Sequence, residues 1–214
     1  MNPRINVAHY DFAKEILGYG LRLIIWLQGC HKRCNECITP EFQALRGGQS
    51  MTSGKLFNVI KFYIEEMHID GITFSGGDPL IQFSNFQSLL PKLKNLYPKI
   101  DVNLYTGYSY NIQKKEFENL PSSIGNLDLT GIDLIIDGEF IKDLAGDFLL
   151  RGSSNQKLIP LTVLGQERLT FMQNNFSGNR LALSRNGSPF LMGIPSVNTL
   201  AKLDSRLQKM GIER

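Results

Sequence analysis

Short apolar runs alternate with amphipathic stretches along most of the chain. Four predominantly apolar runs predict buried strands at residues 21–27, 70–74, 101–105 and 132–136. Apolar positions spaced three and four residues apart predict helices at residues 54–67, 85–97 and 112–120. Strands and helices in this order form right-handed βαβ units. The pattern therefore predicts an α/β fold built on a parallel sheet.

The alternation weakens after about residue 165. Short apolar runs separated by turn-forming residues predict small antiparallel strands at residues 169–171, 180–184 and 189–192. An amphipathic stretch predicts a closing helix at residues 197–210. We therefore expect a main domain at residues 1–165 and a short C-terminal extension at residues 166–214.

Chemically unusual residues follow each of the four predicted strands. They are Cys30, the run Ser75-Gly76-Gly77-Asp78, the run Tyr105-Thr106-Gly107 and the pair Asp137-Gly138. In a parallel sheet the carboxyl ends of the strands meet at one edge, and ligands bind there. The sequence therefore predicts one shared site at this edge.

Composition narrows the class of protein. Hydrophobic residues make up 42% of the chain and charged residues 20%, which is typical of a globular protein. The net charge of +3 is too small to favour a nucleic-acid partner. The longest apolar run, at residues 23–27, is far shorter than the roughly 20 residues of a membrane helix. The first ten residues lack the apolar core of a signal peptide, so we expect a cytoplasmic protein with no membrane partner.

All three cysteines of the chain, Cys30, Cys34 and Cys37, lie in one C-x3-C-x2-C motif. An odd, clustered set is a poor disulfide framework but can bring three sulfurs to one point. Iron–sulfur clusters normally have four protein thiolates, so three would leave one iron open to a small molecule. The positive charges of Lys32 and Arg33 are expected to favour the thiolate forms.

Two other interpretations of the cysteines remain open at this point. A structural zinc site could use the three cysteines with His31 as the fourth ligand, although its position next to Cys30 makes joint tetrahedral ligation awkward. Three buried free thiols are disfavoured by the polar neighbours Lys32, Arg33, Asn35 and Glu36. A non-enzymatic zinc or iron–sulfur binding module is therefore an alternative of another class.

The motifs together resemble a known family. A C-x3-C-x2-C motif after the first strand resembles radical S-adenosylmethionine (SAM) enzymes, and residues 5–160 resemble the activating enzymes of anaerobic (class III) ribonucleoside-triphosphate reductase. The resemblance rests on Gly18-Tyr19-Gly20-Leu21-Arg22, Leu27-Gln28-Gly29-Cys30, Thr39-Pro40-Glu41, residues 73–80, Leu104-Tyr105-Thr106-Gly107-Tyr108 and Arg151-Gly152-Ser153-Ser154-Asn155-Gln156. The chain departs from the family at Asp78, where glutamate is frequent, and at Tyr19, where proline is common.

The resemblance implies a partial (βα)6 barrel with the site at its carboxyl end. It implies that the three cysteines hold a [4Fe-4S] cluster whose open iron binds SAM. Reduction of the cluster would cleave SAM to a 5′-deoxyadenosyl radical. It places the remaining cofactor-binding residues at the strand ends: Ser75, Gly76, Gly77, Asp78, Tyr105, Thr106 and Asp137. Arg151 and Asn155 are further candidates, for SAM or for a partner chain.

The partner implied by the resemblance is an anaerobic ribonucleotide reductase or another glycyl-radical protein, from which the radical would abstract a glycine hydrogen. A flavodoxin-like or other one-electron donor is expected to reduce the cluster. Residues 166–214 have no counterpart in the family as the motifs define it, so a radical SAM enzyme that modifies a small molecule or a peptide is the alternative.

Overall fold

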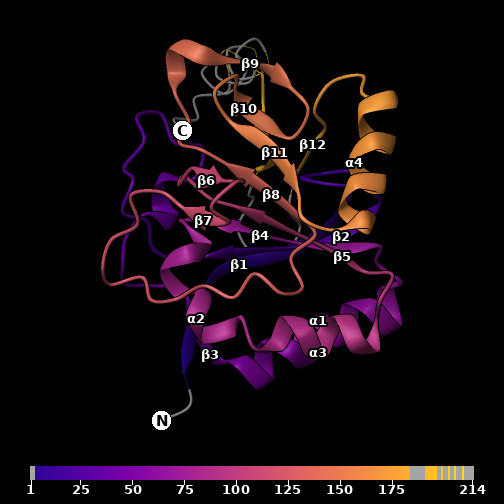
Figure 1. Ribbon diagram of the computed structural model, residues 1–214. Helices are drawn as coiled ribbons and strands as arrows, with labels where there is room; N and C mark the ends of the chain where they lie inside the picture. Colours follow the sequence, from indigo (N-terminus) through magenta and orange to yellow (C-terminus); the bar gives the residue numbers. More distant parts are fainter. Residues whose placement is uncertain are drawn as a thin grey trace.

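The computed structural model describes residues 3–183 and 191–196, with a few single positions beyond them. Its centre is a seven-stranded sheet with the strand order β11-β8-β5-β4-β2-β1-β3 (Figure 1). The strands are β1 (Arg4–Lys14), β2 (Leu21–Leu27), β3 (Gln49–Thr52), β4 (Gly71–Gly76), β5 (Asp101–Tyr105), β8 (Leu134–Asp137) and β11 (Lys157–Pro160).

The middle of the sheet is parallel, and its edges are antiparallel. Strands β2, β4, β5 and β8 pair in parallel, whereas β1, β3 and β11 join antiparallel to their neighbours. The α/β class and the parallel sheet predicted from the sequence are confirmed. Within the described residues the sheet stays open and does not close into a barrel.

Helices cover both faces of this sheet (Figure 1). Helices α1 (Ser53–Met67) and α3 (Leu89–Leu96) lie side by side on one face, and α4 (Val163–Asn174) lies on the other. Strand β8 shows why both faces of the sheet are apolar. Ile135 packs in the same cluster as the α1 and α3 side chains, while Leu134 and Ile136 pack against Leu169 of α4. This alternation follows from the two-residue period of a strand.

The remaining described elements are short. They are the helix α2 (Phe83–Phe86), the hairpin β6 (Tyr110–Asn111) and β7 (Glu116–Phe117), the hairpin β9 (Ala145–Phe148) and β10 (Arg151–Ser153), the hairpin β12 (Leu181–Leu183) and β13 (Leu191–Gly193), and 3-10 turns at Pro40–Phe42, Pro79–Gln82 and Lys142–Leu144.

Two predicted helices were wrong in detail. Residues 112–120 were expected to be helical, but this region holds the β6–β7 hairpin, in which the Tyr110 and Phe117 rings pack at 4.9 Å between centroids. The helix predicted at residues 85–97 is split into α2 and α3. Pro91 explains the split, because proline has no amide hydrogen to donate and is tolerated only in the first turn of a helix.

The prediction for the C-terminal part was partly wrong. Residues 169–171 were expected to form a strand, but they lie inside α4, which also spans the expected domain boundary at residue 165. The other two predicted strands correspond to the paired strands β12 and β13. The closing helix predicted at residues 197–210 lies largely outside the described residues. Strands β1, β3 and β11 were not predicted. No described helix is long and apolar enough to cross a membrane.

Candidate cluster and cofactor site

The three cysteines lie in the loop that follows β2, and all three line a cavity of about 210 Å³ at the carboxyl end of the parallel strands. Cys30 is buried, and Cys34 and Cys37 are half-buried. The Lys32 amide donates a hydrogen bond to Cys30 Sγ over 3.3 Å. Thr39 Oγ1 lies 3.9 Å from Cys37 Sγ and also donates to the Gly76 carbonyl, which ties the loop to β4.

The surroundings of the cysteines favour the neutral thiols. Burial raises the pKa of Cys30, and burial together with the nearby Glu139 carboxylate raises the pKa of Cys34 to about 12. The Lys32 ammonium lies over the Tyr108 ring, 4.3 Å from the centroid, and 3.9 Å from Glu139 Oε2. The energy needed to remove the thiol protons must therefore come from metal binding itself.

The donor set fits an iron–sulfur cluster better than a single ion. Three sulfurs line one cavity together with the Gly76-Gly77-Asp78 turn, so a molecule on the open iron of a cluster would lie beside that turn. Across the described part of the chain, no three His, Cys, Asp or Glu side chains are arranged to hold a single metal ion. His31, the fourth ligand of the zinc alternative, is exposed.

The two glycines after β4 allow two stretches of backbone to meet. The Gly77 amide donates to the Leu27 carbonyl over 2.8 Å, and the Asp78 amide donates to the Gly29 carbonyl over 2.7 Å. A Cβ on Gly77 would overlap the Gly29 carbonyl oxygen, and Gly76 has a φ of +114°. Ser75, Gly76 and Gly77 all line the cavity. The glycines thus position the cysteine loop, whatever ligand they also face.

Asp78 links the end of β4 to the end of β5. Its buried carboxylate accepts hydrogen bonds from Thr106 Oγ1 at 3.0 and 3.1 Å, from the Gly107 amide at 2.9 Å and from the Leu80 amide at 3.0 Å. Burial raises the pKa of Asp78 to about 6 in spite of these hydrogen bonds. Asp78, Thr106 and Gly107 all line the cavity.

Tyr105 and Asp137 differ in their relation to the cavity. Tyr105 lines it, and its hydroxyl donates to the Leu150 carbonyl over 3.0 Å. Asp137 does not belong to the described lining. Its buried carboxylate accepts hydrogen bonds from the Tyr110 amide at 2.7 Å and the Lys157 amide at 3.0 Å, which join β8 to β6 and β11. The observed contacts of Asp137 are therefore structural.

The run at residues 151–156 forms a closed turn whose inner members reach the cavity. Gln156 accepts from the Gly152 and Ser153 amides and donates to the Gly138 carbonyl over 2.8 Å. Gly138, Gly152 and Gln156 line the cavity. Arg151 and Asn155 are not among the described lining residues: Arg151 donates to the Gln156 carbonyl and Asn155 to the Glu139 carbonyl.

Several lining residues were not expected from the sequence. Trp26, on the inner face of β2, and Phe140 both line the cavity. A wall also comes from the end of the described chain, where Leu191, Gly193, Ile194 and Pro195 line the same cavity as the cysteines. The two-residue period of a strand places Ile24 and Trp26 on the same face of β2, and this is the sequence signal that could have indicated Trp26 as a lining residue.

Comparison with known proteins places this chain in a family. The family model described as "4Fe-4S single cluster domain" matches residues 16–159, which include all three cysteines and all four strand ends. This chain belongs to that family. The anaerobic ribonucleoside-triphosphate reductase-activating protein of Enterobacteria phage T4 is 31% identical over 143 residues, covering 66% of this chain and 85% of that protein.

A second curated relative matches less of the chain, and a solved structure of low sequence identity aligns with most of it. The pyruvate formate-lyase-activating enzyme of Clostridium pasteurianum is 32% identical over 98 residues, covering 44% of this chain and 40% of that enzyme. The crystal structure of QueE from Escherichia coli aligns with 98% of this chain and 92% of its own, at 12% identity and a TM-score of 0.41.

Membership in the 4Fe-4S single cluster domain family confirms the cluster predicted from the cysteine motif. The named relatives are activating proteins, which agrees with the predicted radical SAM enzyme and its two cofactors. The residues in the wall at 191–195 lie beyond the matched span of 16–159, so this part of the site is built by sequence outside the family model.

Proposed function

We propose that this protein is a glycyl-radical activating enzyme whose partner is an anaerobic ribonucleotide reductase. The observation that carries the proposal is the shared cavity: Cys30, Cys34 and Cys37 face the same space as the Gly76-Gly77-Asp78 turn. The identity to the phage T4 activating protein, which extends over most of that protein's length, supports the choice of partner.

In this proposal Cys30, Cys34 and Cys37 ligate three irons of a [4Fe-4S] cluster, and SAM binds the fourth. When bound and reduced, the cluster supplies the electron that cleaves the sulfonium S–C5′ bond of SAM, giving methionine and a 5′-deoxyadenosyl radical. The protein's own part is to bind and orient. The cavity beside the Gly76–Asp78 turn holds the methionine part, and Thr106 keeps the turn in place through Asp78.

The hydrogen transfer itself needs no further reactant. A Cα–H bond of a glycine in the partner breaks homolytically, and the hydrogen atom forms a C–H bond at C5′. The products are 5′-deoxyadenosine and a glycyl radical. One electron per turnover enters through the cluster, and we propose a flavodoxin-like protein as its source.

The test uses protein reconstituted anaerobically with iron and sulfide. We expect dithionite and SAM to give 5′-deoxyadenosine, and addition of the anaerobic reductase of the same organism to give a glycyl radical in the EPR spectrum. The variant Cys34→Ala should lose both signals, whereas His31→Ala, an exposed residue in the same loop, should keep them.

Three results would contradict the proposal in different ways. Equal SAM cleavage by the Cys34→Ala variant would refute the cluster assignment. A colourless protein with one bound zinc would favour the non-enzymatic binding module. SAM cleavage without a radical on the reductase, together with turnover of another compound, would favour a radical SAM enzyme acting on a small molecule or peptide.

A further inference from the structure

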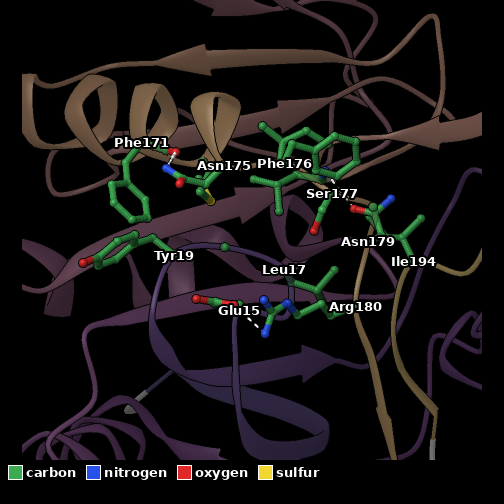
Figure 2. A pocket seen from close by; sticks show the side chains of 15 residues that line it. Glu15, Leu17, Tyr19, Phe171, Asn175, Phe176, Ser177, Asn179, Arg180 and Ile194 are labelled. Carbon is green, nitrogen blue, oxygen red and sulfur yellow. Dashed lines mark hydrogen bonds and ion pairs between the residues drawn. The ribbon is translucent and has the colours of Figure 1, made fainter.

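A second cavity, of about 320 Å³, adjoins the cofactor cavity. One of its sides is the loop at residues 15–19, and the other is the end of α4 with the segment up to residue 180 (Figure 2). Leu17 and Ile194 line both cavities. The two cavities therefore adjoin at these two residues.

The inner side of this second cavity is held firmly by the sheet. The Leu17 carbonyl accepts hydrogen bonds from Thr73 Oγ1 at 3.0 Å and Asn103 Nδ2 at 3.3 Å, and Leu17 has a φ of +58°. The Tyr19 carbonyl accepts from the buried Arg22 guanidinium at 2.9 Å. Contacts with three neighbouring strands thus fix the loop that divides the two cavities.

The outer side is built by sequence beyond the family match. Phe171, Asn175 and Ser177 line it and lie after residue 159, where the match ends. Asn179 anchors this segment to the β9–β10 hairpin, because its side chain accepts from the Leu150 amide at 3.2 Å and donates to the Phe148 carbonyl at 2.8 Å. One side of the cavity is therefore built by residues beyond the family match, and the other side by the loop at residues 15–19.

The lining favours an uncharged, extended polypeptide. Among the described lining residues only Glu15 and Arg180 are charged, and they neutralise each other in an ion pair of 2.7 Å. No unpaired cation is thus offered to a phosphate. Phe171 is 51% exposed and packs edge-on against Tyr19, so an aromatic surface lies at an open side of the cavity. Aromatic rings with neighbouring amide and hydroxyl groups suit a peptide backbone.

We propose that the second cavity seats the hydrogen-donor segment of the protein partner, an uncharged extended stretch that contains the glycine. This inference rests on the proposed function and assigns it a place: the glycine would approach the cofactor cavity beside Leu17 and Ile194. The C-terminal segment would then select the partner, while the residues within the family match hold the cluster.

The experiment compares Ser177→Trp, which puts a large side chain at a lining position of the second cavity, with Gln173→Trp, an exposed α4 position outside its lining. For each reconstituted variant, 5′-deoxyadenosine formed with dithionite and glycyl radical formed on the anaerobic reductase are measured together. We expect the ratio of glycyl radical to 5′-deoxyadenosine to fall at least tenfold in Ser177→Trp and to stay unchanged in Gln173→Trp.

A second measurement does not depend on activity. The photo-reactive residue p-benzoylphenylalanine is placed at position 177 of the cluster-free chain, and the crosslinked reductase peptide is identified by mass spectrometry. We expect a crosslink to the segment around the radical glycine. A wild-type ratio in Ser177→Trp, a loss of SAM cleavage in that variant, or crosslinks only elsewhere would overturn the assignment of the cavity. Failure of the wild-type enzyme to activate the reductase would instead refute the proposed function, and the inference with it.

Discussion

At the scale of single residues, the strand ends carry groups that serve the fold and the site together. Asp78 lines the cofactor cavity, yet its carboxylate also accepts hydrogen bonds from the Leu80 amide, the Thr106 hydroxyl and the Gly107 amide. A carboxylate can accept at every position, which an amide cannot. The functional and structural interpretations of this motif are therefore not exclusive.

The variant Asp78→Asn tests this dual role. Its amide nitrogen would face a hydrogen-bond donor and leave that donor unsatisfied in a buried place. We expect the free energy of unfolding at neutral pH to fall by about 1–3 kcal/mol. Urea denaturation of the cluster-free protein measures this, and a variant as stable as the wild type would show that the hydrogen bonds contribute nothing.

The raised pKa of Asp78 gives a pH dependence with a definite sign. Burial raises this pKa to about 6, above its ordinary value of about 3.9. Between these values the folded protein retains a proton that the unfolded chain has lost, so stability falls as pH rises. The difference in unfolding free energy between wild type and Asp78→Asn should therefore decrease by up to about 3 kcal/mol from about pH 4 to about pH 6. A difference that is constant over this range would contradict the shift.

Gly77 leaves no room for a side chain. A Cβ there would overlap the Gly29 carbonyl and lie 2.6 Å from the Phe42 carbonyl, whereas a Cβ on Gly125 would meet nothing within 4 Å. We expect Gly77→Ala to lower the free energy of unfolding by about 1–3 kcal/mol and to reduce the iron bound after reconstitution. Gly125→Ala is the matched control and should change neither quantity.

At the scale of elements, a buried polar network joins the three neighbouring strands β2, β4 and β5. Arg22 is fully buried and donates to Asp101 at 2.9 Å, to Thr73 Oγ1 at 2.9 Å and to the Ile72 carbonyl at 2.7 Å. It also holds the Tyr19 carbonyl. The network therefore fixes both the start of the parallel sheet and the loop that separates the two cavities.

Replacing one member of this buried pair should be costly. Arg22→Met would leave the Asp101 carboxylate buried without its partner, and we expect a loss of about 3–5 kcal/mol in unfolding free energy. The exposed pair between Lys61 and Glu65 is the control, and Lys61→Met should cost less than about 1 kcal/mol. The double variant Arg22→Met, Asp101→Asn should recover part of the loss. No recovery would mean that the unpaired charge is not the cause.

At the scale of the whole molecule, residues far along the chain form one wall of the site. Met192 of β13 is buried in one cluster with Trp26 of β2 and Phe42 of the cysteine loop. The next residues, Gly193 and Ile194, line the cofactor cavity. Residues distant in sequence thus line the same cavity and pack in the same cluster.

The single tryptophan reports on this contact. Met192→Lys would place a charge beside Trp26, which is 3% exposed. We expect β13 to separate from β2 and the tryptophan emission to shift to longer wavelength. Leu183→Lys, at a position of β12 that is 65% exposed, should leave the emission unchanged. An unshifted spectrum in Met192→Lys would show that water does not reach Trp26.

Much of the fold and the site could be predicted from local pattern. The parallel strands are predominantly apolar runs because both of their faces are covered, and such runs are visible in any single sequence. The cysteine loop and the Gly-Gly turn follow those runs directly, so the topology of a parallel sheet sufficed to bring them together. The β6–β7 hairpin was not predicted because apolar spacing alone does not distinguish short helices from hairpins. The split between α2 and α3 was not predicted because the apolar spacing of residues 85–97 runs on through Pro91.

The sequence by itself therefore determined the chemistry of the site. Each candidate ligand follows its strand by a few residues, and the spacing of the three cysteines does not depend on long-range contacts. The wall of the cavity is different. Ile194 reaches Leu17, and Met192 reaches Trp26, only through packing between segments far apart in the chain. Such contacts produce no periodic pattern in the sequence. For that reason, only the tertiary structure decided that a second cavity exists and that it adjoins the first.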